Sequence, residues 1–364
     1  MTSPSVAVAW TVTDDMLVAR YGDLQAGMIA AGSRWAWKAG DRSGLDDEAT
    51  ARREIELYLT TSAPPAPTPG HALPAWAAVP GDDGRPVRRH WSAAEYHADS
   101  RLSRSDLLLF EQSARLYAGQ RRTKTIPAPA TTAAMRFGTL VHQRILEADD
   151  FRRAVWVRPE NFNGRTNAGK SEIAEIRARG LLELDMDEAR RIDGCAAALL
   201  AHPEARGLVE RCEREVTWTW RERVRLSDDV VELDCRARLD LYLEKDGRLG
   251  IGDLKTTDDP SPAAFARSVG TYGYHYQPPF YARPLRQLFG VEPAFRFIAV
   301  RSRPPHEVVV YRVAPEDVAR ADKLVDAALR RFAQAVLTDT WCSPWEAPGV
   351  RTLEFPRWVL EDRS

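Results

Sequence analysis

The feature that most constrains the fold is a run of alternating apolar and polar side chains over residues 230–243. A period of two kept over this length predicts a β-strand with one buried face. Residues 248–255 (RLGIGDLK) predict a second strand, and Asp246-Gly247 between the two runs suits a tight hairpin turn. If these two residues form the loop, Lys245 pairs with Arg248. Counting outward from that pair then places Asp240 directly opposite Asp253.

This register brings two carboxylates together. Directly opposed residues share a sheet face, with Cβ atoms about 4.5–5.5 Å apart, and like charges in these positions destabilise the sheet. Lys255 projects from the same face because it lies two residues beyond Asp253. A divalent cation would relieve the repulsion, since Mg²⁺ commonly binds one or two carboxylates together with substrate phosphate. The pattern indicates a metal-dependent phosphodiesterase centre, although a surface ion pair between Asp240 and Lys255 would show the same spacing.

Composition narrows the class of protein. A hydrophobic content of 44% and a charged content of 28% are typical of a globular chain. The formal net charge of −1 gives no overall basic field, so attraction to DNA would have to come from local clusters such as residues 121–124 (RRTK). The four cysteines are scattered without a CxxC pair, which argues against zinc and iron–sulfur sites and favours a reducing compartment. The N-terminus shows neither a signal peptide nor a membrane span, so we expect a cytoplasmic protein.

The order of predicted elements indicates an α/β fold, with a central mixed β-sheet flanked by helices. Apolar spacing over residues 13–60 predicts a helical N-terminal extension covering 1–62, followed by a proline- and glycine-rich linker over 63–88. The main domain is expected over 89–345, and a C-terminal tail over 346–364. Within the main domain, helices are predicted over 103–120, 135–151, from about 171, and over 186–212, 275–289 and 316–338; further strands are predicted over 154–159, 215–220, 295–303 and 307–314.

A second motif competes for the functional assignment. Residues 164–171 (GRTNAGKS) satisfy the GxxxxGK[ST] pattern of a phosphate-binding P-loop. A P-loop should directly follow a buried parallel strand, whereas the polar segment 158–163 precedes this one. An ATPase would also need a Walker-B strand, for which residues 249–253 (LGIGD) are the candidate. This strand lies in the predicted hairpin and not in a parallel sheet. We therefore expect a basic surface loop here and not an ATPase.

Three segments together resemble the PD-(D/E)XK nuclease superfamily, and within it the exonuclease VIII (RecE-like) branch. They are residues 137–151 (FGTLVHQRILEADDF), 235–259 (CRARLDLYLEKDGRLGIGDLKTTDD) and 272–285 (YGYHYQPPFYARPL), in the order that is found in this family. The chain is also similar to RecB-type nuclease domains. The resemblance covers roughly residues 90–340 and implies a restriction-endonuclease-like core.

The resemblance also implies roles for particular residues. His142, Asp240 and Asp253 would bind the metal ion, with the carbonyl of Leu254 as a further ligand, and Lys255 would be the catalytic lysine. Gln277 and Tyr281 match the family's QxxxY element, whose members face the DNA or support the active site. The expected metal is Mg²⁺, and the imidazole ligand makes Mn²⁺ a second candidate.

The chain departs from the family pattern at two places. Leu239 replaces the proline of the superfamily's name, which carries no chemistry. Pro278-Pro279 lies inside the QxxxY element, so Gln277 and Tyr281 can share a face only if Gln277 stands at the start of a helix. The cysteines of the iron–sulfur relatives are absent, which argues against the CRISPR-associated and AddB-like branches.

The expected function is a Mg²⁺-dependent exodeoxyribonuclease that acts on the ends of linear double-stranded DNA in phage or bacterial recombination. By resemblance its polarity is 5′ to 3′, its partner is a single-strand annealing protein, and it forms a homo-oligomeric ring. The alternatives are a RecB-like nuclease module of different polarity and an inactive DNA-binding protein. The aromatic residues of segment 272–281 would either stack on unpaired bases or pack in the core.

Overall fold

The computed structural model describes residues 9–13, 16–21, 24–31, 34–39, 42–52, 55, 84–227, 229–346, 350 and 352–354. The chain divides into two compact units, Met1–Gly70 and His71–Ser364. Most of the linker and of the C-terminal tail expected from the sequence lies outside the described residues, so their proposed bounds stay predictions.

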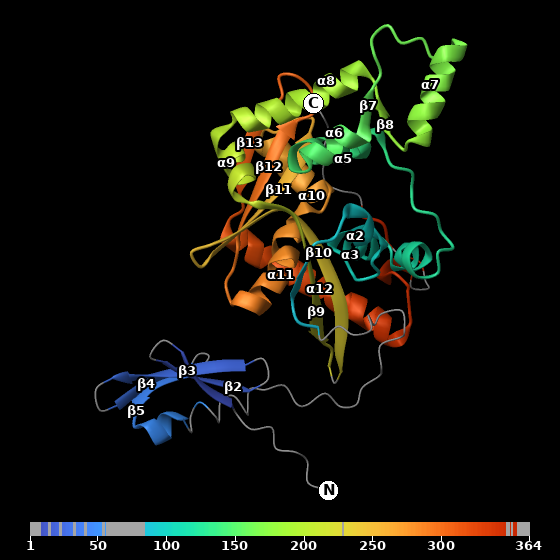
Figure 1. The fold of residues 1–364 in the computed structure, drawn as a ribbon. Coiled ribbons are helices and arrows are strands. Elements are labelled where there is room, and N and C mark those ends of the chain that lie inside the picture. The colour runs from blue at the N-terminus through green and yellow to red at the C-terminus, as the bar shows by residue number, and fades with distance from the viewer. Residues whose placement is uncertain are drawn as a thin grey trace, which may run out of the picture. The chain divides into compact units, whose positions relative to one another are not determined.

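The first unit contains a five-stranded antiparallel sheet in which each strand pairs with the next (Figure 1, blue). Its strands are β1 (Ala9–Thr13), β2 (Met16–Tyr21), β3 (Leu24–Ala31), β4 (Arg34–Ala39) and β5 (Arg42–Asp46). The helical extension predicted from residues 13–60 is therefore wrong over these strands, and among the described residues of this unit helix is found at 48–52 and 55. Short alternating runs such as RWAWKA favour strands, because aromatic and β-branched side chains suit a pleated surface.

The second unit is built on a six-stranded mixed sheet with the order β13-β12-β11-β10-β9-β6. Only β11 and β12 pair in parallel; the other neighbours are antiparallel. This confirms the α/β class and the mixed central sheet. The strands are β6 (Val87–Arg89), β9 (Glu213–Arg225), β10 (Val230–Lys245), β11 (Arg248–Thr257), β12 (Ala294–Arg301) and β13 (Val308–Arg312).

The hairpin between β10 and β11 has the predicted register. Lys245 pairs with Arg248, and the ladder continues without a break to Leu241 opposite Gly252. The turn residues Asp246 and Gly247 both have positive φ angles, 49° and 70°. Two successive positive φ values are those of the primed turn that matches the twist of the flanking strands.

Helices pack against this sheet in two groups (Figure 1). One apolar core joins the sheet to α3 (Arg104–Gln112), α4 (Ala114–Tyr117), α10 (Pro262–Thr271), α11 (Gln277–Phe289) and α12 (Pro315–Thr338). A second core joins it to α5 (Ala133–Leu146), α6 (Ala148–Ala154), α8 (Met186–Ala201) and α9 (Pro203–Arg211). The remaining elements are α2 (Ala93–Ala98), β7 (Val155–Val157), α7 (Asn167–Ala178), β8 (Leu182–Leu184), a π-helical turn (Ala118–Arg122) and two 3₁₀ turns (Tyr274–Tyr276, Pro344–Glu346).

The helix predicted from Ser103 begins as expected. Ser103 accepts a hydrogen bond from the backbone N–H of Asp106, and the Asp106 carboxylate accepts one from that of Ser103, which is a capping box. The helix stops at Gln112 instead of continuing to residue 120. Ser113 has an extended backbone and caps the following helix, so the predicted single helix is broken into α3, α4 and the π-helical turn.

The GRTNAGKS segment does not have the geometry of a P-loop. Helix α7 begins at Asn167 with Thr166 as its N-cap, so Gly169 and Lys170 lie inside its first turn. A Cβ atom at Gly169 would lie 2.2 Å from the carbonyl oxygen of Asn163, which explains the glycine by close packing of the backbone. A carbonyl oxygen in this position would repel a phosphate. The expected surface loop is found only at residues 164–166 and is wrong from Asn167 on, where helix α7 has already begun.

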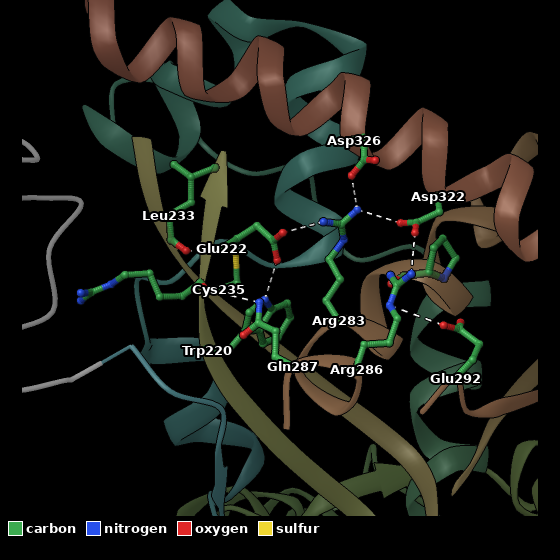
Figure 2. Close-up of polar contacts among 12 residues, drawn as sticks. Trp220, Glu222, Leu233, Cys235, Arg283, Arg286, Gln287, Glu292, Asp322 and Asp326 are labelled. Carbon is green, nitrogen blue, oxygen red and sulfur yellow. Dashed lines mark hydrogen bonds and ion pairs between the residues drawn. The ribbon is translucent and has the colours of Figure 1, made fainter. Parts of the chain in front are cut away.

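A network of ion pairs holds α11 against α12 and β9 (Figure 2). Arg283, whose side chain is 9% exposed, donates to Glu222 at 2.6 Å and to Asp322 at 2.7 Å, and it also donates to Asp326. Glu222 further accepts a hydrogen bond from the indole N–H of Trp220 at 3.1 Å. Helix α11 supplies Gln277 and Tyr281, so this network fixes the helix on which they lie.

Replacing Arg283 by Leu is expected to destabilise the second unit by about 3 kcal/mol, because it leaves the largely buried carboxylate of Glu222 without its cation, whereas Asp322 keeps its pair with Arg286. Urea denaturation of the variant and the parent measures this difference. Arg320→Leu is the matched control on α12. Arg320 is 78% exposed and contacts Asp317 at 3.4 Å, so its loss should change stability by less than about 1 kcal/mol. Equal effects of the two substitutions would contradict the role given to Arg283.

Candidate metal centre

Three side chains from three different elements meet beside the hairpin. His142 of α5, Glu215 of β9 and Asp240 of β10 each offer a ligand atom, and these atoms lie within 4.8 Å of one another. His142 Nδ1 is 3.4 Å from Asp240 Oδ2. Helix α5 can approach the sheet closely at Gly138, where a Cβ atom would lie only 3.2 Å from Thr256 Oγ1. The structure thus brings His142 and Asp240 together, as the resemblance implied.

Glu215 was not among the residues predicted from the sequence. Strand β9 pairs Val216 with Leu239 and Arg214 with Leu241, so Glu215 lies across from Asp240. Its φ angle is +55°, in the left-handed region that residues other than glycine rarely adopt. Backbone strain of this kind persists only where surrounding contacts enforce it, and it is concentrated at functional sites. Strand β9 (EREVTWTWRERVR) has charged residues at both ends, so nothing local in the sequence distinguished Glu215.

Arg238 is the main contact that holds Glu215 in place. Its guanidinium donates to the Glu215 carboxylate, to the carbonyl oxygen of Trp91 at 2.8 Å and to Glu147 at 3.3 Å. The side chain of Arg238 is only 11% exposed. A largely buried cation therefore supports the Glu215 carboxylate, and we assign Arg238 a positioning role.

The second carboxylate of the hairpin is held differently. Asp253 is 2% exposed and accepts hydrogen bonds from Lys255 Nζ and, at 2.5 Å, from Gln277 Nε2. The backbone N–H of Leu254 donates to Asp240 Oδ2 at 2.8 Å, and the Leu254 carbonyl lies 3.4 Å from Lys255 Nζ. Asp253 is thus next to the three-residue group without being part of it.

The two prolines do not disrupt the QxxxY element. Helix α11 begins at Gln277, and Pro278 and Pro279 occupy its first turn, where the missing N–H groups would have had no helical partner. Gln277 Nε2 donates to the Tyr281 hydroxyl at 3.2 Å, so these two residues do share a face. Gln277 Oε1 is buried and has no hydrogen-bond partner among the residues that the structure describes.

Burial and repulsion set the protonation of the group. Burial, followed by the charge of Asp253, raises the pKa of Asp240 to about 7. Burial and the neighbouring Asp240 raise the pKa of Glu215 to about 7 as well. Burial, followed by the charge of Lys255, lowers the pKa of His142, so its imidazole is neutral near pH 7. Two carboxylates that resist ionisation beside a neutral imidazole are an oxygen and nitrogen donor set that a divalent cation would stabilise.

In metal-free protein, this arrangement should cost stability at alkaline pH. A carboxylate whose folded pKa is raised to about 7 binds its proton more tightly in the folded state than in the unfolded state, where the pKa is about 4. Stability is therefore lost as pH rises from about 4 to about 7, and the penalty is fully present at pH 8. Asp240→Asn is expected to raise the Tm in EDTA at pH 8, by about 2–4 °C for each kcal/mol of relief, and by less at pH 5.5.

Differential scanning calorimetry at the two pH values measures this effect. Asp229→Asn, an exposed aspartate in the loop between β9 and β10, is the control and should leave the Tm unchanged at both. A Tm for Asp240→Asn that falls at pH 8 would contradict the raised pKa.

The family of the chain follows from a match to a family model. A model described as a "PDDEXK-like domain of unknown function (DUF3799)" matches residues 103–346, which is more than half of the chain. The chain belongs to this PDDEXK-like family. The match spans α3, the hairpin and α11, and thus every site residue named above. It does not distinguish the exonuclease VIII branch, which stays a prediction.

Three solved structures align with this PDDEXK-like protein at low sequence identity. A "Putative exonuclease" from Eubacterium rectale is 14% identical, with a TM-score of 0.47, and the alignment covers 76% of this chain and 100% of that one. SSO0001 is 13% identical, with a TM-score of 0.24, and the alignment covers 61% of this chain and 84% of that one. VC1899 from Vibrio cholerae is 12% identical, with a TM-score of 0.21, and the alignment covers 70% of this chain and 58% of that one. No curated protein matches the sequence.

Proposed function

We propose that this PDDEXK-like protein is a divalent-metal-dependent exodeoxyribonuclease that hydrolyses linear double-stranded DNA from its ends. Family membership supports a nuclease. The observation that carries the proposal is the meeting of His142, Glu215 and Asp240 beside Asp253 and Lys255, because this set combines metal ligands with a cation for phosphate.

In this proposal, His142, Glu215 and Asp240 hold the metal ion. Asp253 and the Leu254 carbonyl, which lie next to Lys255, would be further ligands. Mg²⁺ is the expected ion, and Mn²⁺ would also suit the imidazole. A bound ion of this kind polarises a phosphoryl oxygen and lowers the pKa of water. Lys255 Nζ would stabilise the charge that develops on the phosphate. Gln277 and Tyr281 orient Asp253, because the Gln277 amide donates to both.

DNA attraction in this proposal does not come from residues 121–124. Arg121 pairs with Asp106 at 2.6 Å, and Arg122 pairs with Asp339 at 2.8 Å and lies over the ring of Trp341. These charges are largely neutralised by neighbours in the protein.

Among the described helices, none has both the length and the apolar character that crossing a bilayer requires.

The finer parts of the proposal rest on the resemblance. They are 5′ to 3′ polarity, a role in phage or bacterial recombination, an annealing protein as partner, a homo-oligomeric ring and a cytoplasmic location. A RecB-like module of the opposite polarity is the alternative within the same family. An inactive DNA-binding protein is disfavoured because Lys255 donates directly to Asp253, beside three side chains that could hold a metal ion.

One assay tests the activity and its direction. Linear duplex labelled at either the 5′ or the 3′ end, and closed circular duplex, are incubated with the protein and Mg²⁺, with Asp253→Asn as the inactive control. Loss of label as mononucleotides from linear DNA, with the circle intact, is the expected result. Nicking of the circle would indicate an endonuclease, and degradation that persists in Asp253→Asn would overturn the site.

A further inference from the structure

The aromatic residues around the start of α11 differ in burial. Tyr276, Phe280 and Tyr281 are each less than 10% exposed and pack in the core, so none of them offers a ring face to a base. Tyr272 at the end of α10 is 61% exposed. Core packing therefore explains one part of this aromatic segment but leaves Tyr272 unexplained.

Tyr272 lies at the edge of the candidate metal centre. Its ring centroid is 5.5 Å from that of Tyr274, and the two planes are inclined by 31°. The ring of Tyr274 in turn lies 4.9 Å from Lys255 Nζ. A single intervening ring thus separates an exposed aromatic surface from the lysine that would contact the phosphate.

Packing fixes the position of these rings. Gly273, between the two tyrosines, has a φ angle of +64°, and a Cβ atom there would lie 2.7 Å from the side chain of Leu108. The turn is therefore held tightly against α3. The Tyr274 ring also contacts Phe265 and Phe297 in the core, with centroids 6.4 and 6.2 Å apart. The exposed ring extends a preformed surface, so binding to it would require little ordering.

A cation without a protein partner lies beside the same rings. Among the described residues, no hydrogen bond or ion pair of the Arg104 guanidinium is found, and its Nε atom is buried without a partner. Arg104 lies one turn before Leu108 on the same face of α3, and Leu108 packs against Gly273 between the two tyrosines. Arg104 therefore lies on the side of α3 that faces this turn. In agreement with this position, the charge of Arg104 opposes the rise that burial causes in the pKa of Tyr274 and of Tyr281.

We propose that Tyr272 stacks on an unpaired base of the DNA strand being cleaved, while Arg104 binds a phosphate of that strand. The substrate favoured by this surface is a duplex end with unpaired terminal nucleotides. Stacking on an aromatic ring is sequence-tolerant because every base has a π-face, and an arginine fork matches a phosphate oxygen pair. The proposal rests on the proposed nuclease function and adds the form of the DNA end to it.

A binding experiment tests stacking without relying on activity. The probe is a duplex with three mismatched terminal pairs and 2-aminopurine at its end, with Ca²⁺ in place of Mg²⁺ under conditions verified to leave the DNA intact. We expect the wild type to quench the fluorescence, Tyr272→Ala to bind at least about fivefold more weakly with little quenching, and Tyr272→Trp to restore both. Arg104→Gln should weaken binding and reduce the salt slope of log K by about 0.7–0.9, whereas Tyr272→Ala should not change that slope.

Phe289→Ala is the matched control. Phe289 is also an exposed aromatic residue, but it lies at the opposite end of α11, about 18 Å from Gln277. It should quench like the wild type. In a parallel cleavage assay with Mg²⁺, the wild type should prefer the mismatched end over a blunt end, and Tyr272→Ala should lose that preference. Wild-type quenching and preference in Tyr272→Ala would overturn the inference, whereas Tyr272-dependent quenching without any cleavage would overturn only the nuclease proposal.

Discussion

Lys255→Ala is expected to lower kcat for DNA cleavage by about 10²–10³-fold, the usual cost of removing one group that stabilises transition-state charge. Lys255 is 12% exposed, and its Nζ donates to Asp253 and approaches the Leu254 carbonyl. Among the described residues, no other lysine is found in contact with this site, so none could replace the lost charge. Single-turnover cleavage of end-labelled duplex at saturating Mg²⁺ measures the loss.

The same variant should keep its affinity for metal. Lys255 repels a cation that approaches Asp253, so its removal should leave Mn²⁺ binding equal or tighter in calorimetric titration. Lys245→Ala is the matched control, because Lys245 lies on the same hairpin, is exposed and pairs with Arg248 at the turn. It should cleave like the parent. A loss of metal affinity in Lys255→Ala as large as its loss of rate would contradict the division of roles.

Asp240→Asn is expected to abolish the stabilisation that Mg²⁺ or Mn²⁺ provides. A ligand that binds only the folded state raises stability in proportion to the logarithm of its concentration over Kd, so the Tm of the parent should rise with added metal. Substitutions that only support a ligand cost about 10–100-fold in metal affinity, and loss of a direct ligand should exceed this. Metal titrations followed by Tm measure the effect.

The EDTA experiment serves as an internal control for this variant. Asp240→Asn should be at least as stable as the parent without metal, so a lost response to Mg²⁺ cannot be explained by unfolding. Glu215→Gln should show a weakened metal response as well. If Glu215→Gln responded to metal like the parent, then Glu215 would not be a ligand, and its strained backbone would need another explanation.

The hairpin and the sheet around it could be predicted from sequence because local signals agreed. Alternation over residues 230–243, the Asp246-Gly247 turn and the second strand all indicated the same register, and the structure has it. The helical prediction over residues 13–60 failed for the opposite reason. Widely spaced apolar residues fit a helical period, whereas the two-residue gaps such as Gly22-Asp23 and Gly40-Asp41, which are typical of hairpins, were the better signal.

The missed part of the site depends on non-local pairing. Glu215 reaches Asp240 only through the register of β9 with β10, and no local pattern reports that register. Arg238 looked like one polar residue in an alternating strand, and its three acceptors come from three separate segments. The position of Gln277 could be predicted because proline restricts where a helix can start.

The left-handed backbone at Glu215 bears on how this protein could be engineered. Glycine would adopt φ +55° without steric cost and would also remove a buried carboxylate of raised pKa. A library selected only for heat tolerance should therefore accumulate changes at this position, whereas a library selected for metal response should keep the acid. Sequencing the codon for residue 215 after each selection would show whether the acid is lost under heat selection and kept under metal selection.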